Sequence, residues 1–225
     1  RNVLSQTSGS KNTALGMNCM EQNSSGEQNT AVGTRALVNN TTANNNTAVG
    51  NDALFTNTTG TKNTAVGSFA LDANTTGNNN TAVGFEASTA TTTAYENVAM
   101  GTQALQAATT GRQNVAVGYR ALYSDTTGKE NVAIGQHAGY SNTTAQEGTF
   151  VGQSAGYNVT TGHYNTYIGR KAGQATTTSG YNTAVGNKAL LLNTTGEANT
   201  TVGFHSLYSN TTASQNCAFG YSALF

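Results

Sequence analysis

The side chains that most often take part in chemistry are few in this sequence. Three histidines occur, His137, His163 and His205, together with two cysteines, Cys19 and Cys217. A zinc site needs three or four such ligands around one ion, and a disulfide needs Cα atoms about 4.4–6.8 Å apart. Whether these side chains meet therefore depends on the elements that position them.

The acidic residues are scattered singly, as at Asp52, Asp72, Glu86 and Asp125. Glycosidases use two carboxylates that flank one bond, and calcium-binding rolls use Asp-rich repeats. No phosphate-binding loop occurs either, since no glycine is followed by Lys-Ser or Lys-Thr. The sequence predicts no catalytic residue, no cofactor, no cofactor-binding residue and no metal ligand, and we expect the protein not to be an enzyme.

Thr, Ala, Asn and Gly fill more than half of the 225 residues, and proline is absent. Ten Lys and Arg balance ten Asp and Glu, so the formal net charge is zero. Nucleic-acid binding depends on a basic surface, and a membrane span requires about 20 apolar residues. The longest apolar run, Ala189–Leu192, is far shorter. We therefore expect neither nucleic-acid binding nor membrane insertion.

A motif of the type Asn-Thr-Ala-Val-Gly recurs every 17 residues without an insertion or deletion. Its thirteen copies begin at Asn12, Asn29, Asn46, Asn63, Asn80, Asn97, Asn114, Asn131, Gly148, Asn165, Asn182, Asn199 and Asn216. Stacked coils do not tolerate length drift, because one extra residue shifts the register of its strand. The sequence predicts an all-β fold, a parallel β-solenoid (β-roll) of thirteen 17-residue coils that spans 1–225 as one domain. A partial coil at 1–11 and an incomplete last coil, without polar caps, indicate a segment of a longer fibre.

Numbering each copy from its first residue as position 0 gives columns with distinct environments. Position 4 is always Gly, which indicates a positive φ or a crowded backbone. Positions 1 to 3 are predicted to form a short strand, with the apolar residue at position 3 in the core. The Ala-Leu pair at positions 7 and 8, as in Ala53-Leu54, is a second core element. Positions 11 to 14, as in Asn57–Gly60, indicate a second strand or a corner, and the Asn at position 0 an amide ladder or a turn.

The core predicted in this way is thin for a single chain, since each coil buries only two larger apolar side chains. We therefore expect the alanines at position 2, with Phe150 and Tyr167 in the same column, to pack against other chains. Leu at position 8 is replaced by Gly139, Gly156 and Gly173 in three consecutive coils, which predicts local repacking.

The solenoid also separates the reactive residues. His137 and His205 share position 6 but lie four coils apart, and strands are spaced about 4.8 Å apart, so the two histidines cannot share a metal ion. The same spacing excludes a disulfide between Cys19 and Cys217.

The unit Asn-Thr-Ala-Val-Gly-x-x-Ala-Leu with an Asn-Thr-Thr-Gly spacer, as at Asn46–Gly60, resembles the repeats of phage tail-fibre proteins. The Val-Ala-Val-Gly sequence at Val115–Gly118 is similar to the head repeats of YadA-type trimeric autotransporter adhesins. In that family the repeat forms a left-handed parallel β-roll, and three chains associate around one axis. The resemblance therefore implies a left-handed homotrimer that serves as the shaft or head of an extracellular fibre. Such a fibre, in a virion tail or on a cell surface, supports attachment to a host; a bacterial adhesin head is the alternative.

Two further interpretations stay open. Regular threonine arrays on β-solenoids are typical of some ice-binding proteins, but adjacent threonines in a strand point to opposite faces. We therefore expect only one of the threonine columns, at positions 12 and 13, to face outward. The tyrosines at exposed positions are candidates for contact with a cell-surface carbohydrate or receptor, and packing on neighbouring coils is the alternative. They are Tyr119, Tyr123, Tyr140, Tyr157 and Tyr208.

Overall fold

The computed structural model describes residues 8–225, which contain strands and turns and no helix. The chain divides into two compact units, Arg1–Gln113 and Asn114–Phe225. The predicted fold class, an all-β parallel solenoid of 17-residue coils, is confirmed. Most of the partial coil expected at 1–11 lies outside the described residues.

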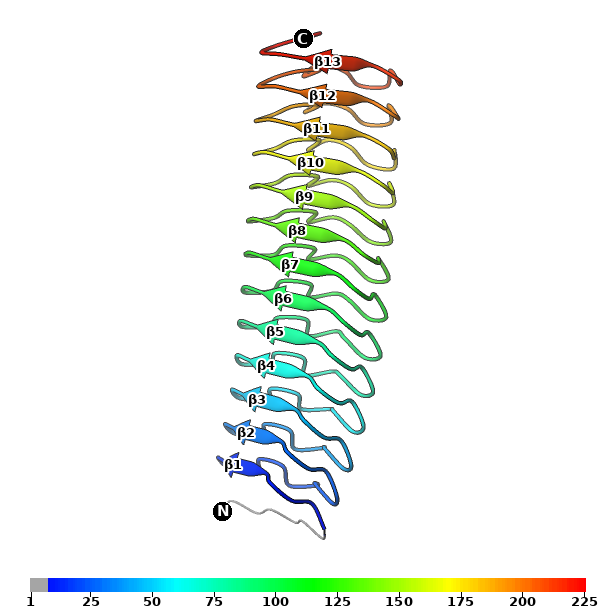
Figure 1. The fold of residues 1–225 in the computed structure, drawn as a ribbon. Helices are drawn as coiled ribbons and strands as arrows, with labels where there is room; N and C mark the ends of the chain where they lie inside the picture. The colour runs from blue at the N-terminus through cyan, green and yellow to red at the C-terminus, as the bar shows by residue number, and fades with distance from the viewer. Residues whose placement is uncertain (1–7) are drawn as a thin grey trace. The chain divides into compact units, whose positions relative to one another are not determined.

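Each coil contributes one strand of three residues at positions 1 to 3, and strands within a unit stack in chain order (Figure 1). The strands of the first unit are β1 (Thr13–Leu15), β2 (Thr30–Val32), β3 (Thr47–Val49), β4 (Thr64–Val66), β5 (Thr81–Val83) and β6 (Val98–Met100). Those of the second unit are β7 (Val115–Val117), β8 (Val132–Ile134), β9 (Thr149–Val151), β10 (Thr166–Ile168), β11 (Thr183–Val185), β12 (Thr200–Val202) and β13 (Cys217–Phe219). Equivalent positions pair with each other, for example Thr47 with Thr64, so the 17-residue period fixes the register.

Backbone hydrogen bonds join each coil to its neighbours at several points of the turn. The Thr47 N–H donates to the carbonyl of Asn63 at 2.8 Å, and the Gly50 N–H to that of Val32 at 2.8 Å. On the far side of the coil the Leu54 N–H donates to the Ala70 carbonyl at 3.0 Å. A proline at any of these positions would remove a donor, which accounts for the absence of proline.

The core of each coil is formed by positions 2, 7 and 8. Ala48, Ala53 and Leu54 are fully buried, as are their equivalents in most coils. The predicted core pair at positions 7 and 8 is confirmed. The prediction that the position-2 column packs against other chains is wrong, because Phe150 and Tyr167 are also completely buried within this chain.

The prediction that position 3 belongs to the core is also wrong. Val66 is 36% exposed and Met100 is 43% exposed. The physical reason is the alternation of side chains along a strand. Because the alanine at position 2 points inward, positions 1 and 3 point outward.

The invariant glycine at position 4 has both properties expected of it. Its φ is positive in every coil, for example 138° at Gly50. A Cβ atom on Gly50 would lie 2.5 Å from the carbonyl oxygen of Gly67 in the next coil. Every other residue type would therefore be strained in conformation and would separate the coils.

Residues other than glycine also take left-handed conformations, at positions 6, 8 and 16. Asp52, Leu54 and Asn45 have φ of 57°, 51° and 61°. Leucine rarely adopts this region, and no sequence signal predicts it here. The hydrogen bonds between coils hold these corners. Most coils have three such residues, and in three coils the residue at position 8 is glycine, as at Gly139.

Positions 11 to 14 form a corner of bends without a second strand. The amide ladder predicted at position 0 is confirmed: Asn29 Oδ1 accepts from the Asn46 N–H at 2.9 Å, and Asn46 Nδ2 donates to the Gly60 carbonyl at 2.8 Å. A second buried ladder follows position 11, where Asn57 Nδ2 donates to Asn40 Oδ1 at 3.0 Å. Two rows of buried Asn side chains thus link the polar corner of each coil to the same corner of the next coil.

Candidate functional site

The histidines and cysteines form no cluster. Among residues 8–225, no three His, Cys, Asp or Glu side chains lie close enough together to hold a metal ion. His137 and His205 contact aromatic rings instead, and both cysteines are free, Cys19 buried and Cys217 exposed. No cleft or cavity is found in this part of the chain.

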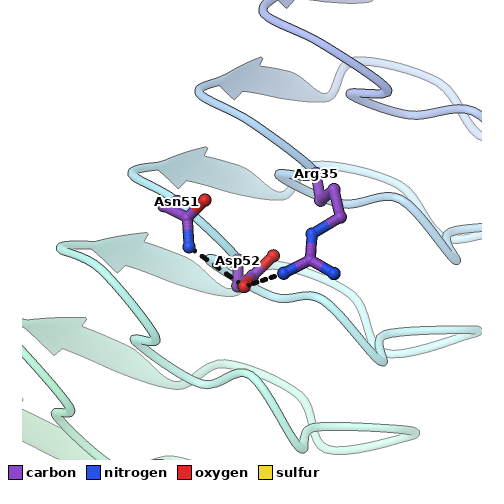
Figure 2. A network of polar contacts seen from close by, with 3 residues as sticks. All are labelled: Arg35, Asn51 and Asp52. Carbon is purple, nitrogen blue, oxygen red and sulfur yellow. Dashed lines mark hydrogen bonds and ion pairs between the residues drawn. The ribbon is translucent and has the colours of Figure 1, made fainter.

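Asp52, one of the scattered acids, takes part in a polar network of the first unit (Figure 2). Arg35 Nη2 donates to Asp52 Oδ2 at 2.5 Å, and Asn51 Nδ2 donates to the same oxygen at 3.0 Å. The Asp52 side chain is 6% exposed and the Arg35 side chain 47%. The Arg35 guanidinium also lies 5.1 Å from the centre of the Phe55 ring. These contacts tie neighbouring coils together and give Asp52 a structural role.

Asp125 replaces the usual Asn at position 11 in the first coil of the second unit, and it is fully buried. Its Oδ1 accepts from the Gly128 N–H at 2.7 Å, while Oδ2 has no hydrogen-bond partner within residues 8–225. Burial raises the pKa of Asp125 to about 7, against the opposing effect of the Gly128 hydrogen bond. A raised pKa marks a candidate acid when it lies in a cleft. Asp125 lies inside the coil, out of reach of a substrate, and is a titrating group of the interior.

In each unit, the outward side chains of the strands, at positions 1 and 3, form a surface that we call the strand face. Position 1 is Thr, Val or Cys, and position 3 is Leu, Val, Met, Ile or Phe, so neither column carries a charge. Large apolar side chains are well exposed on it, including Leu15, Met100, Ile134 and Phe219. Extended exposed apolar surfaces mark interaction sites in soluble proteins. The sequence signal for this face was the pair of uncharged columns on either side of position 2, which is Ala in most coils.

The threonines at positions 12 and 13 form a second regular surface. Thr58 Oγ1 donates to the Thr75 carbonyl at 3.1 Å, and Thr143 Oγ1 donates to that of Thr160 at 3.1 Å. Position 12 is half-buried and position 13, as at Thr59, is exposed. Position 13 is thus the column that faces outward, as expected for one of the two, although these residues lie in a bend and not in a strand.

Four of the five candidate tyrosines are brought together on the second unit. Tyr123, Tyr140 and Tyr157, at position 9 of successive coils, form an aromatic ladder with ring centres 5.1 and 4.9 Å apart and interplanar angles of 1° and 6°. His137 meets Tyr140 and Tyr157 edge-on, and its ring centre lies 5.3 Å from that of Tyr119. Burial, aided by the positive charge of Arg120, lowers the pKa of His137. The tyrosines therefore pack on neighbouring coils, as one of the two interpretations expected, and the cluster is still partly exposed, since Tyr119 is 40% exposed.

The fifth candidate, Tyr208, lies elsewhere on the second unit. Its ring centre is 4.8 Å from that of His205 and 5.2 Å from that of Phe225. His163, at position 15, accepts a hydrogen bond from the Gln146 N–H at 3.0 Å and contacts Tyr164. Neither group joins the aromatic ladder.

The fold and these surfaces define the class of the protein as a parallel β-solenoid. Comparison with protein-family models, curated proteins and solved structures finds no match to this chain. The part of the chain that the structure describes has no helix of the length and apolar character needed to cross a membrane.

Proposed function

We propose that this chain is a non-enzymatic structural segment, shaft or head, of a homotrimeric extracellular fibre, either a viral tail fibre or a surface adhesin. The observation that carries the proposal is the strand face, an uncharged outward surface with large apolar side chains repeated in every coil. The role of such a segment is mechanical. It holds a binding tip away from a particle or cell and so supports attachment to a host or surface.

The strand face suits association with copies of the same chain. Apolar surface removed from water contributes about 25 cal/mol per Å². Each coil adds one apolar side chain at position 3, so the stabilisation grows with the number of coils that associate. No charged side chain has to be desolvated, which is the main cost of burying a polar interface. The three-fold axis and the left-handed coil are what the resemblance to the adhesin head repeats implies.

The mass of the purified chain in solution tests this proposal. Light scattering after gel filtration should give about three times the chain mass of 23.1 kDa. Ile168→Lys places a charge from each copy on the strand face and should release monomers that keep the β-type circular dichroism spectrum. The matched control is Gln153→Lys at position 5, outside the strand face. An unmodified chain that is a stable monomer would contradict the proposal.

The fibre and the adhesin differ in the segments that flank such a shaft. A chaperone domain downstream would favour the tail fibre, and a coiled-coil stalk with a membrane anchor would favour the adhesin. The sequence of the full-length gene product separates these two alternatives.

Ice binding is a second candidate function, favoured by the two threonine columns that both reach the surface. The position-12 hydroxyls bond to the next coil, as at Thr75, whose Oγ1 donates to the Thr92 carbonyl at 3.0 Å. The same contact recurs in neighbouring coils, as at Thr58, so the half-buried position-12 threonines repeat at the spacing of the coils beside the exposed position-13 column. Thermal hysteresis of the purified chain, lost on replacing Thr59 and Thr76 by Tyr, would support ice binding. An absence of hysteresis removes this candidate.

A further inference from the structure

Although the formal net charge of the chain is zero, cations and acids occupy different positions of the coils in the second unit, Asn114–Phe225. Side chains at positions 5, 6 and 9 share one side of the coil, because His137 at position 6 contacts both Tyr119 at position 5 and Tyr140 at position 9. We call this side of the second unit the basic flank. It has no acidic residue and carries four of the unit's five cations: Arg120, Arg170, Lys171 and Lys188.

The acids of the second unit lie at other positions. Glu130, Glu147 and Glu197 occupy positions 15 and 16, and Asp125 is buried. In the first unit the same positions 5, 6 and 9 are acidic instead, with Asp52, Asp72 and others against a single arginine. The basic character is therefore local to one flank of the second unit, and a local field of one sign attracts ligands of the opposite sign.

Three of the four cations of the basic flank are available to a ligand. Arg170, Lys171 and Lys188 have no carboxylate partner among residues 8–225. Arg170 Nε donates to Gln153 Oε1 at 3.0 Å, which leaves its terminal nitrogens unbonded to any described carboxylate. A guanidinium held by one neutral contact can still donate two parallel hydrogen bonds to an anionic group.

The aromatic ladder lies on the same flank and offers hydroxyl groups at a regular rise. None of the phenol hydroxyls of Tyr123, Tyr140 and Tyr157 has a hydrogen-bond partner within the described residues. The rings are stacked about 5 Å apart, so they repeat along the direction in which the coils stack. The flank thus combines three cations that have no described carboxylate partner, Arg170, Lys171 and Lys188, with a row of hydroxyl donors and acceptors over several coils.

We propose that the basic flank of the second unit binds an anionic polysaccharide. Arg170, Lys171 and Lys188 contact its carboxylate or sulfate groups, and the hydroxyls of the aromatic ladder bond to its sugar hydroxyls. An extended polymer fits a surface that repeats from coil to coil better than a compact ligand does. The flank lies outside positions 1 and 3, so this binding is independent of association through the strand face.

The ring geometry distinguishes a polysaccharide from single-stranded nucleic acid. Nucleic acids bind aromatic side chains by stacking bases on exposed ring faces. In the ladder the ring faces of Tyr140 are covered by Tyr123 and Tyr157, so the ladder presents ring edges and hydroxyls. This arrangement favours a hydroxyl-rich polymer.

Titration calorimetry of the full chain tests the proposal with four probes. Polygalacturonate supplies carboxylates, dextran sulfate supplies sulfates, uncharged dextran is the neutral control, and oligo-deoxythymidine is the nucleic-acid control. We expect binding of one or both anionic polysaccharides that weakens as salt increases, with no binding of uncharged dextran. The proposal would be overturned if the oligonucleotide bound more tightly than either anionic polysaccharide. It would also be overturned if neither polygalacturonate nor dextran sulfate bound.

Two variants and a matched control locate the site. The double variant Arg170→Gln/Lys171→Gln should weaken polysaccharide binding by about tenfold. Tyr140→Phe keeps the ring stack, removes one hydroxyl and should weaken binding by about threefold. Lys129→Gln removes the one cation of the unit that lies outside the basic flank, and it should leave the affinity unchanged. Equal weakening by Lys129→Gln and by the double variant would show non-specific attraction and refute the site.

Discussion

Phe150 packs directly against Gly156 in the same coil, where most other coils place an alanine against a leucine. A Cβ atom on Gly156 would lie 2.7 Å from Phe150 Cε1, and one on Gly139 in the preceding coil would lie 2.9 Å from Phe150 Cδ2. Gly173 and Tyr167 show the same relation, since a Cβ atom on Gly173 would lie 2.6 Å from Tyr167 Cδ2. The large side chain has moved from position 8 to position 2, so the coil keeps its filled interior.

This exchange predicts strong coupling between Phe150 and Gly156. Phe150→Ala leaves a cavity and should cost about 3–5 kcal/mol, and Gly156→Leu overpacks the coil and should cost about 1–3 kcal/mol. The double variant restores the usual Ala and Leu arrangement and should cost at least about 2 kcal/mol less than the sum. Urea unfolding of all four proteins measures the coupling, and additive losses would contradict the exchange.

Because position 2 of each strand points inward and position 3 points outward, larger side chains should be tolerated at position 3 but not at position 2. Ala48 is fully buried, so Ala48→Leu should destabilise the fold by about 1–3 kcal/mol through overpacking. Val49 is half-exposed on the strand face, and Val49→Leu should change the free energy of unfolding by less than about 0.5 kcal/mol. Thermal unfolding at equal protein concentration compares the two. Similar losses for both variants would place position 3 in the core after all.

Asp125 predicts a loss of stability as the pH rises. Its folded pKa of about 7 lies above the usual value of about 3.9, so the folded state binds more protons between these values. The free energy of unfolding should therefore fall by roughly 3 kcal/mol from about pH 4 to pH 7. Asp125→Asn should remove this fall and be more stable than the parent above pH 7. Glu130→Gln, at an exposed carboxylate of the same coil, is the control, and parallel pH profiles for Asp125→Asn and the parent would refute the assignment.

In the Arg35–Asp52 pair, we expect removal of the arginine alone to destabilise the fold more than removal of both charges. Arg35→Met leaves the buried Asp52 carboxylate with fewer partners, and it should cost about 1–2 kcal/mol. Arg35→Met combined with Asp52→Asn should cost less, because the buried charge is gone. Arg112→Met is the control, since the Arg112 guanidinium lies 5.8 Å from the Tyr95 ring centre without a carboxylate partner among the described residues. Chemical denaturation checks the order, and a double variant less stable than Arg35→Met would contradict it.

Much of the fold could be predicted from the sequence because the 17-residue period is a strong constraint. It located each strand, the Ala-Leu core pair and the invariant glycine, whose Cβ would collide with the next coil. It also predicted the amide ladder at position 0, because a buried Asn can bond the same residue one coil away. The left-handed leucines at position 8 could not be predicted, since leucine gives no local signal for that conformation.

The candidate surfaces depended more on three-dimensional structure. The sequence identified Tyr119, Tyr123, Tyr140 and Tyr157 as candidates, but only the fold showed that His137 and these tyrosines form one cluster. The basic flank was hidden by the zero net charge, because charge balance over a chain says nothing of how charges divide among faces.

The sequence by itself therefore determined the repeat, the number of coils and the residues of each column, since a fixed period leaves one way to stack them. The tertiary structure decided which side of each strand faces water. A three-residue strand such as Thr47–Val49 has apolar side chains on both faces, so alternation alone does not choose between them. The choice depends on which column fits inside the closed coil, and the small Ala48 fits where Val49 and Thr47 do not.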